Sequence, residues 1–444
     1  MKMETISLEK YKSILKDLDT LKVYGRVKRL IGVTIESEGP AGSVGDLCYI
    51  RKKSGEFIPT EIVGFKEGFV ILMPLGNMDG IASSAFVQTS SGPLKIRVGN
   101  ELLGRVLDGL GNPIDGKGEI KKYHKELPIY NSPPNPMERD RIVHPIALGI
   151  KAIDSEITCG KGQRIGLFAG SGVGKSTLLG MIARNSEADV NVIALIGERG
   201  RELKEFIEKD LGEEGIKRSV VVVATSDQSP LVRMKGALVG TTIAEYFRDQ
   251  GLNVMLLMDS VTRFAMSQRE VGLAAGEPPT TRGYTPSVFA LLPKLLERAG
   301  TSSTGTITAI YTVLVDGDDM NEPIADAVRS ILDGHIVLSR KMAHQNHYPA
   351  IDVLQSVSRV MPAVVSEKHL TCAGKLRNTI STYNEAKDLI EIGAYKAGSN
   401  PKIDYAIKMN DPIMNFLKQK VEEKPRYSDT ISSLISMFGT GGGN

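Results

Sequence analysis

Five short, largely apolar runs recur through the middle of the chain, and stretches with helical patterns separate them. They are Arg164–Ala169, Asn191–Ile196, Ser219–Ala224, Val254–Met258 and Ile307–Val313. A strand without a polar face has to be buried on both sides, which is the environment of a parallel sheet covered by helices. The segment from Ile150 to Pro362 is therefore predicted to form an α/β domain around a parallel sheet.

The first apolar run leads directly into a glycine-rich loop that contains a lysine. The loop reads Ala169-Gly-Ser-Gly-Val-Gly-Lys-Ser176, and a helical pattern continues from Thr177. This strand–loop–helix order fits the phosphate-binding loop, apart from Ala169, where the stricter pattern has glycine. The glycines allow successive backbone N–H groups and the start of the helix to face phosphates. The predicted nucleotide contacts are Ala169, Gly170, Ser171, Gly172, Val173, Gly174, Lys175, Ser176 and Thr177.

Side chains in and beyond this loop are suited to a magnesium nucleotide. Lys175 is predicted to reach the β and γ phosphates, and the Ser176 hydroxyl is predicted to ligate Mg²⁺. A second metal contact is expected where another buried strand ends, and Asp259 follows Val254–Met258 at such a position. The expected cofactors are therefore ATP and Mg²⁺.

A glutamate, Glu198, follows the second apolar run. A carboxylate at this edge of the sheet, beside a γ-phosphate, can orient and polarise the attacking water. Alone, the sequence Gly-Glu-Arg-Gly is a weak signal and is more typical of a solvated loop. Its position downstream of a phosphate-binding loop in the same sheet favours a hydrolytic role.

Charge and cysteine content restrict the remaining classes. The 55 basic and 52 acidic residues give a net charge of +3, which is far from the sustained basic excess of a nucleic-acid-binding protein. Three widely spaced cysteines without a Cys-x-x-Cys pair indicate free thiols in a reducing, cytoplasmic setting. No run reaches the length of a membrane-spanning helix, so any membrane association is expected to be peripheral.

Changes in residue pattern along the chain predict four segments. Residues 1–22 are predicted to form an amphipathic helix, which either packs on the next domain or contacts a partner protein. Residues 23–92 contain short strands and glycine turns typical of a small β-barrel. Residues 93–362 form the predicted ATPase core, in which Gly104–Gly116 is interpreted as a tight connector. Residues 363–444 are predicted to form a helical domain with a disordered tail.

Several longer motifs resemble a known family. They include LIGERGRE at Leu195–Glu202, DSVTRFAMSQ at Asp259–Gln268 and PAIDVLQSVS at Pro349–Ser358. Their order resembles that of the RecA-like ATPases related to the α and β subunits of ATP synthase. Within that group, the residues are most similar to those of the flagellar and type III secretion ATPases. The resemblance extends from about Val23 to Leu417 and implies a RecA-like core with an N-terminal barrel and a C-terminal helical domain.

The resemblance implies roles for four further residues. Arg359, directly after the last motif, matches the arginine finger that reaches a neighbouring subunit's nucleotide. Tyr348 matches an aromatic residue that stacks on adenine. Arg199 and Arg263 match positions that line the γ-phosphate. For each arginine, an intersubunit salt bridge is the alternative interpretation.

By resemblance, the chain is expected to be an ATP-hydrolysing homohexameric motor that energises flagellar protein export. The stretch Ala394–Asn400 lacks the acidic loop of catalytic ATP synthase subunits, which disfavours a proton-driven synthase. The implied partners are a flagellar assembly regulator bound through the N-terminal helix, a central stalk protein, export chaperones and substrates, and an export gate. No nucleic acid is expected, and the implied location is the inner face of the cytoplasmic membrane.

Three alternatives remain open at this stage. An injectisome ATPase of type III secretion shares all of these motifs. A nucleotide-binding docking ring without productive turnover is disfavoured by Glu198 and Arg359. An RNA-translocating hexamer would need a basic, aromatic RNA-binding domain, which the region Tyr24–Thr89 does not resemble.

Overall fold

The computed structural model describes residues 23–315, 317 and 319–439. They form two compact units. One contains the chain up to Leu94 with Ala274–Gly276, and the other contains Lys95–Leu273 and the chain from Glu277. The predicted N-terminal helix and the end of the predicted tail lie outside the described residues. Within the described ranges, no helix is both long and apolar enough to cross a membrane.

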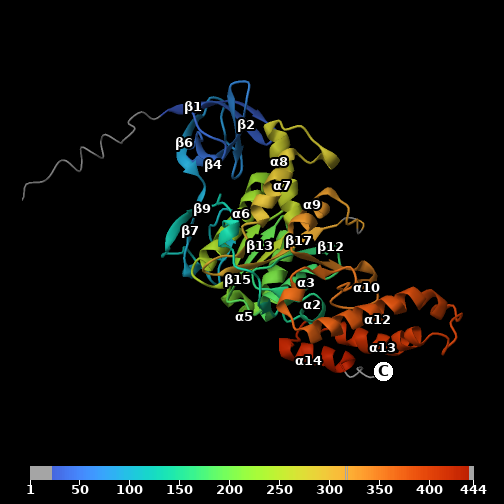
Figure 1. Ribbon diagram of the computed structural model, residues 1–444. Helices are drawn as coiled ribbons and strands as arrows, with labels where there is room; N and C mark the ends of the chain where they lie inside the picture. The colour runs from blue at the N-terminus through green and yellow to red at the C-terminus, as the bar shows by residue number, and fades with distance from the viewer. Residues whose placement is uncertain (1–22, 316, 318, 440–444) are drawn as a thin grey trace, which may run out of the picture. The chain divides into compact units, whose positions relative to one another are not determined.

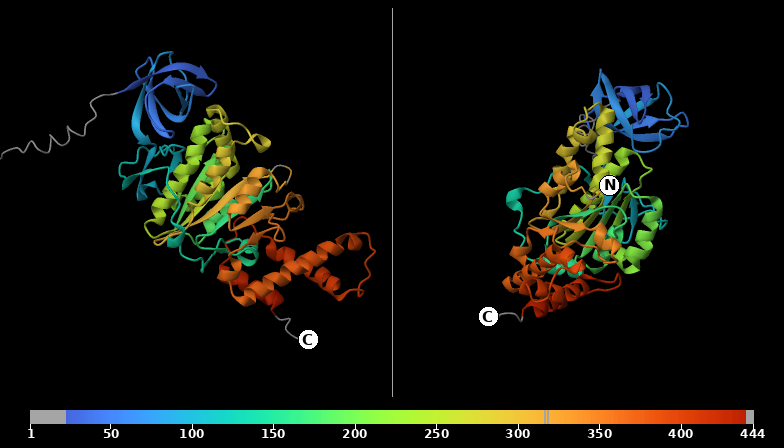
Figure 2. Two further views of the ribbon diagram at one scale, coloured as in Figure 1. Left: turned by 45° about the horizontal axis from the view of Figure 1, so that its top comes forward. Right: turned by 90° about the vertical axis from the view of Figure 1, so that its right-hand side faces the viewer.

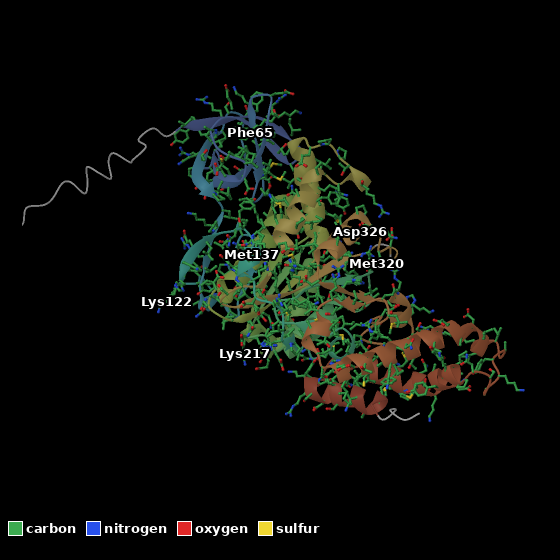
Figure 3. All side chains as sticks on the ribbon, in the orientation of Figure 1. Phe65, Lys122, Met137, Lys217, Met320 and Asp326 are labelled. Atoms are coloured by element: carbon green, nitrogen blue, oxygen red, sulfur yellow. The ribbon has the colours of Figure 1, made fainter. Side chains whose placement is uncertain are left out.

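The first unit is a closed barrel of six antiparallel strands (Figure 1). The strands are β1 (Tyr24–Ile31), β2 (Thr34–Glu38), β3 (Asp46–Arg51), β4 (Phe57–Lys66), β5 (Phe69–Pro74) and β6 (Phe86–Pro93). β1 pairs with both β2 and β6, which closes the barrel. Ile35, Ile50 and Leu72 are buried in its core, whereas Phe65, labelled in Figure 3, is 55% exposed. The predicted barrel is confirmed.

The second unit is built on a nine-stranded sheet with the order β19-β18-β12-β17-β15-β13-β14-β8, in which β16 pairs beside β17. Its parallel strands are β8 (Val106–Asp108), β12 (Arg164–Ala169), β13 (Val190–Ile196), β14 (Ser219–Ala224), β15 (Asn253–Asp259), β17 (Thr306–Leu314) and β18 (Gly334–Leu338). The antiparallel strands are β16 (Gly300–Thr301) and β19 (Val357–Ser358). Two small sheets pair β7 (Lys95–Val98) with β9 (Lys125–Pro128), and β10 (Pro145–Ile146) with β11 (Cys159–Gly160). All five apolar runs become neighbouring parallel strands, as predicted.

The segment Gly104–Gly116 differs from its interpretation as a connector. Val106–Asp108 forms β8, which pairs in parallel with β14 at the edge of the large sheet. The chain then turns back, and an ion pair of 2.6 Å between Arg105 and Asp115 fixes the turn. A three-residue strand that depends on such local contacts leaves too short a pattern for prediction.

Helices cover both faces of the sheet (Figure 1). The longer ones are α3 (Lys175–Asn185), α6 (Pro230–Arg248), α7 (Val261–Ala275), α8 (Pro286–Leu296) and α9 (Pro323–Ile331). The short ones are η1 (Asn100–Leu102), η2 (Pro136–Glu138), α2 (Lys151–Glu156), α4 (Gly200–Glu205), η3 (Phe206–Leu211), α5 (Gly212–Lys217), η4 (Thr281–Gly283), α10 (Arg340–His344) and α11 (Met361–Val364). The crossover from β12 to β13 and the crossover from β14 to β15 run in opposite directions along the sheet. Because such crossovers are right-handed, α3 and α6 cover opposite faces.

Three C-terminal helices complete the second unit. They are α12 (Glu367–Glu391), α13 (Pro401–Leu417) and α14 (Tyr427–Phe438), and α12 and α13 run side by side in both views of Figure 2. Cys372, Leu376 and Leu434 belong to the same buried cluster as Ile153 of α2 and Leu178 of α3. The C-terminal helices therefore share a continuous hydrophobic core with the α/β layer.

An ion pair lies inside this unit. Arg298 and Glu245 are each 2% exposed, and two nitrogens of Arg298 lie 2.7 and 2.8 Å from the two carboxylate oxygens. Arg298 also donates to Thr242 of α6 and to the carbonyl of Ile129, both at 2.8 Å. This pair ties the end of α8 to α6.

We expect Glu245→Ala to lower the free energy of unfolding by about 3–5 kcal/mol, because it leaves a buried guanidinium without its counter-charge. The matched control is Glu270→Ala. Glu270 is 39% exposed and pairs with Arg233 at 3.0 Å, so its loss should cost about 0–1 kcal/mol. Urea denaturation followed by circular dichroism measures both. Equal destabilisation by the two substitutions would contradict this assignment.

Candidate active site

The phosphate-binding loop joins β12 to α3, as the sequence predicts. Gly172 and Gly174 have φ angles of +76° and +87°, a conformation that side chains with a Cβ rarely adopt. Gly174 is the N-cap of α3 and provides no side-chain acceptor to the first turn. The exposed N–H groups at the start of this helix are therefore suited to bind an anion.

The Lys175 side chain lies between two carboxylates at the carboxyl edge of the sheet. Its Nζ is 2.5 Å from Oδ1 of Asp259 and 3.3 Å from Oε1 of Glu198. The exposed fractions are 12% for the Lys175 side chain, 4% for Asp259 and 22% for Glu198. Three side chains that are far apart in the sequence thus meet because β12, β13 and β15 end at the same edge.

This cluster changes the proton affinity of its members. Burial, and then the negative charge of Asp259, raise the pKa of Glu198, although Lys175 opposes the change. Burial disfavours the charge of Lys175, but the two carboxylates outweigh it and raise the pKa of the ammonium. Lys175 is therefore held as a cation, and Glu198 is a stronger base than an exposed glutamate.

Arg263 is folded over the loop that carries Glu198. A Cβ placed on Gly197 would lie 2.9 Å from the Cβ and Cγ of Arg263, so only glycine allows this close approach. Among the described residues, the buried Nε of Arg263 has no hydrogen-bond partner, and Nη1 lies 3.9 Å from the sulfur of Met266. A guanidinium with unused donors at this position is suited to bind an oxyanion.

Arg199 does not join this group. Its side chain is 81% exposed and pairs with Glu202 at 3.3 Å, one turn further along α4. Tyr348, by contrast, is close to the phosphate loop, because a Cβ on Gly174 would lie 3.5 Å from its ring. Tyr348 is 42% exposed, and the ring is therefore accessible to a planar ligand.

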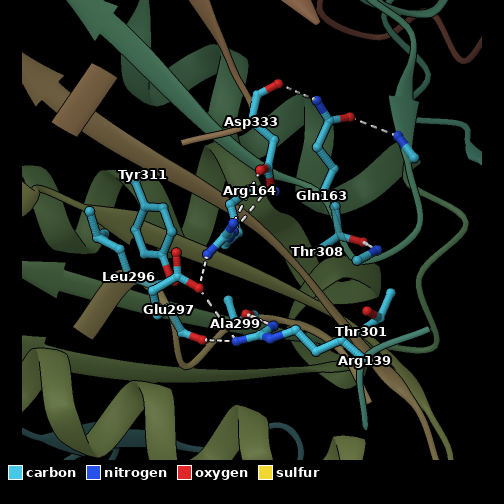
Figure 4. A network of polar contacts seen from close by, with 12 residues as sticks. Arg139, Gln163, Arg164, Leu296, Glu297, Ala299, Thr301, Thr308, Tyr311 and Asp333 are labelled. Carbon is cyan, nitrogen blue, oxygen red and sulfur yellow. Dashed lines mark hydrogen bonds and ion pairs between the residues drawn. The ribbon is translucent and has the colours of Figure 1, made fainter. Parts of the chain in front are cut away.

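Arg359 lies at the opposite end of the strands. β19 pairs with β18 so that Ser358 is opposite Gly334, and the N–H of Arg359 donates to the carbonyl of Asp333 at 3.0 Å. The Asp333 carboxylate is held by Arg164, the first residue of β12, with two distances of 3.1 Å (Figure 4). The phosphate loop begins at the other end of β12, roughly 16 Å away at ~3.3 Å per residue. Arg359 is exposed and does not belong to its own chain's cluster.

Comparisons with known proteins agree with this geometry. Residues 149–358 match the nucleotide-binding domain of the ATP synthase alpha/beta family, and residues 365–436 match the C-terminal domain of the type III secretion ATPase EscN. The chain is 57% identical over 423 residues to a flagellum-specific ATP synthase from Bacillus subtilis. The alignment covers 95% of this chain and 96% of that protein. It belongs to the flagellar and type III secretion ATPases. The family resemblance predicted from the motifs is thereby confirmed, and this ATPase binds nucleotide and hydrolyses ATP.

Solved structures support the same assignment. The structure of the assembled EscN ATPase from enteropathogenic E. coli matches with a TM-score of 0.89 at 48% identity, over 93% of this chain and 100% of that one. A structure of assembled EscN in complex with its central stalk EscO matches with a TM-score of 0.86 at 47% identity, with the same coverage. The predicted fold class, a RecA-like core with an N-terminal barrel and C-terminal helices, is confirmed.

The structure of this ATPase adds one residue that the motifs did not reveal. Thr312 of β17 is fully buried, and its hydroxyl donates to Oδ1 of Asp259 at 2.6 Å. The only signal in the sequence is a hydroxyl side chain near the end of an apolar run, and threonine is common in strands for other reasons. Because Lys175 contacts the same oxygen, Thr312 fixes the orientation of the carboxylate.

We expect Thr312→Val to lower the ATPase rate by about 10- to 100-fold, the usual cost of losing a hydrogen bond behind a functional carboxylate. The control is Thr308→Val on the same strand. Thr308 is also buried, but its hydroxyl accepts a bond from the N–H of Gly162, at the opposite edge of the sheet. Phosphate release measures both variants. A rate for Thr312→Val equal to that of the control would refute the role.

Proposed function

We propose that this ATPase is the homohexameric motor of flagellar protein export and hydrolyses Mg-ATP between adjacent subunits. One observation carries the proposal. Lys175, Glu198 and Asp259 meet at one edge of the sheet, whereas Arg359 lies at the opposite edge. In a head-to-tail ring, that opposite edge can be presented to the next subunit's nucleotide, because such an interface joins two different surfaces of the same chain.

In this proposal the phosphate loop binds the nucleotide and Tyr348 stacks on the adenine. The residues present also fit a metal. Asp259 is a buried carboxylate anchored by Thr312, and Ser176 is exposed at the start of α3. Mg²⁺ prefers hard oxygen ligands and keeps several waters, so one hydroxyl, one carboxylate and phosphate oxygens suit it. When bound, Mg²⁺ neutralises charge that develops on the phosphates.

The remaining side chains have separate roles in hydrolysis. Lys175 moves from its carboxylates to the β and γ phosphates, and this leaves Glu198 free to orient the attacking water. Arg263 donates to the γ-phosphate of its own subunit. Arg359 reaches the γ-phosphate of a neighbour, and Arg199 completes the lining of the site once the loop around it has closed. The contacts of Lys175 and the three arginines stabilise negative charge in the transition state.

The proposed partners follow from the family. EscN has been solved as an assembled ATPase and with a central stalk, and we propose that this chain likewise forms a ring around a stalk protein. We further propose that residues 1–22 bind a flagellar assembly regulator, and that the ring receives export chaperones and substrates at the inner face of the cytoplasmic membrane near an export gate.

An injectisome role is the second candidate, because EscN shares 48% identity. Deletion of this ATPase from the cell distinguishes the two roles. Loss of motility without loss of other protein secretion would support the flagellar role.

We expect the acidic limb of the profile of kcat/KM against pH to lie above the ordinary glutamate pKa. The raised pKa of Glu198 means that the carboxylate gains a proton, and the rate falls, at a higher pH than for an exposed glutamate. Glu198→Gln should abolish turnover yet retain ATP binding, whereas Lys175→Ala should abolish turnover and weaken binding as well. Phosphate release and fluorescent-nucleotide titration measure the two properties. Near-normal turnover by Glu198→Gln would favour another base or a docking ring.

We expect two inactive variants to complement each other in mixed rings. Arg359→Ala subunits retain the phosphate loop, and Lys175→Ala subunits retain the arginine. In a random equal mixture, about a quarter of the head-to-tail interfaces combine an intact loop with an intact arginine, so the rate should recover to about a quarter of the wild-type value. An arginine that acts within its own subunit predicts no recovery.

A further inference from the structure

Arg377 joins the C-terminal helices to the segment that carries Arg359. It lies on α12, and its Nη1 donates to the carbonyl of Ser356 at 3.1 Å. Its Nη2 donates to the carbonyl of Glu156, the last residue of α2, at 2.5 Å. Its Nε lies 3.3 Å from the Glu156 carboxylate. One guanidinium thus bridges three parts of the chain with contacts that no other side-chain type can reproduce together.

The Glu156 carboxylate depends on this arginine. Its side chain is fully buried, and neither carboxylate oxygen has a hydrogen-bond partner among the described residues. Burial raises the pKa of Glu156 to about 8, and the charge of Arg377 partly offsets that effect. With a pKa of about 8, Glu156 is largely protonated near pH 7, so the two backbone carbonyls hold the guanidinium and the buried Glu156 side chain packs beside it.

The segment around Arg359 is also held by β18 and by residues that directly precede strands. The Ser356 hydroxyl accepts from the N–H of Val337 on β18 at 2.9 Å. The Ser358 hydroxyl donates to the carbonyl of Thr158 at 2.9 Å and accepts from Gln163 at 3.0 Å. The Arg359 N–H donates to Asp333. Arg377 provides the anchor that comes from the C-terminal helices. Arg377 is therefore a contact through which a shift of α12 would reach Ser356, three residues before Arg359.

We propose that Arg377, braced by Glu156, is a positioning residue that couples the C-terminal helices to the placement of Arg359 in the neighbouring subunit's active site. The proposal rests on the proposed trans role of Arg359. The geometry gives it a direction: Arg377 acts on the site that its own chain completes, and not on the site of its own phosphate loop. A displacement of about 1 Å at a catalytic group is enough to cost about 10²-fold in rate.

A positioning role of Arg377 affects only the neighbouring subunit's site, whereas a role in stabilising the fold affects its own chain wherever it is placed. Mixed rings distinguish these two effects. Arg377→Met is introduced either into the Lys175→Ala chain, which donates Arg359, or into the Arg359→Ala chain, which donates the phosphate loop. The matched control is Lys375→Met, because Lys375 also lies on α12 and donates to a backbone carbonyl, that of Phe438 at 3.1 Å on α14. Thermal melting and ring assembly are recorded for every chain.

We expect Arg377→Met in the arginine donor to lower the recovered rate by about 10²-fold and in the loop donor to leave it unchanged. Arg377→Lys in the donor should restore only part of the rate, because one ammonium cannot make all three contacts. Equal losses in both chains, or a loss as large for Lys375→Met, would overturn the proposal in favour of a structural role. If the parent mixture without Arg377 variants fails to recover, the trans role of Arg359 itself is wrong. If the parent mixture recovers ATPase activity, and the mixture with Arg377→Met in the arginine donor recovers the same rate, only the role of Arg377 is wrong.

Discussion

The ammonium of Lys175 lies between the carboxylates of Asp259 and Glu198, and the arrangement of the active site depends on this charge cluster. A buried lysine remains charged only when counter-charges are close. The parallel sheet meets that requirement because β12, β13 and β15 all deliver their carboxyl ends to one edge. In the proposed mechanism the same cluster prepares the chemistry, since the raised pKa of Lys175 keeps it a cation for phosphate and the raised pKa of Glu198 makes it a stronger base toward water. Thr312 adds the hydrogen bond that orients Asp259.

The same strand geometry separates Arg359 from its own chain's phosphate loop, so the proposed site lacks this arginine within one chain. β19 runs antiparallel at the sheet edge and brings Arg359 to the amino end of β12, away from the phosphate loop. No local rearrangement of a two-residue strand can bring that arginine across the length of the sheet. Assembly is therefore the simplest way to place it beside a γ-phosphate. Arg377 connects the Arg359 segment to α12, and on the proposed trans role of Arg359 this contact links the C-terminal helices to a neighbour's ATPase rate.

Much of this could be predicted from the sequence, and the limits have physical causes. The apolar strands and the phosphate loop are encoded locally, so their order predicted the sheet and the proximity of Lys175 to Asp259, and the short strands with glycine turns in residues 23–92 predicted the barrel. The role of Thr312 was not predicted, because a single hydroxyl in a strand has no distinctive spacing. The strand β8 was not predicted, because three residues are too few to show a periodic pattern. The contacts of Arg377 join residues that are distant in sequence, and only tertiary packing brings them together. The exposed position of Arg199 likewise follows from the local course of α4.

The central claim, that each active site is shared by two chains, is tested most directly by measuring ATPase activity per chain against protein concentration. Sedimentation velocity on the same samples gives the fraction of assembled chains. The account predicts that specific activity rises in step with assembly and that dilute monomers are slower by about 10³-fold or more, the usual contribution of an arginine supplied in trans. A specific activity that stays constant while the chains pass from monomer to ring would contradict it.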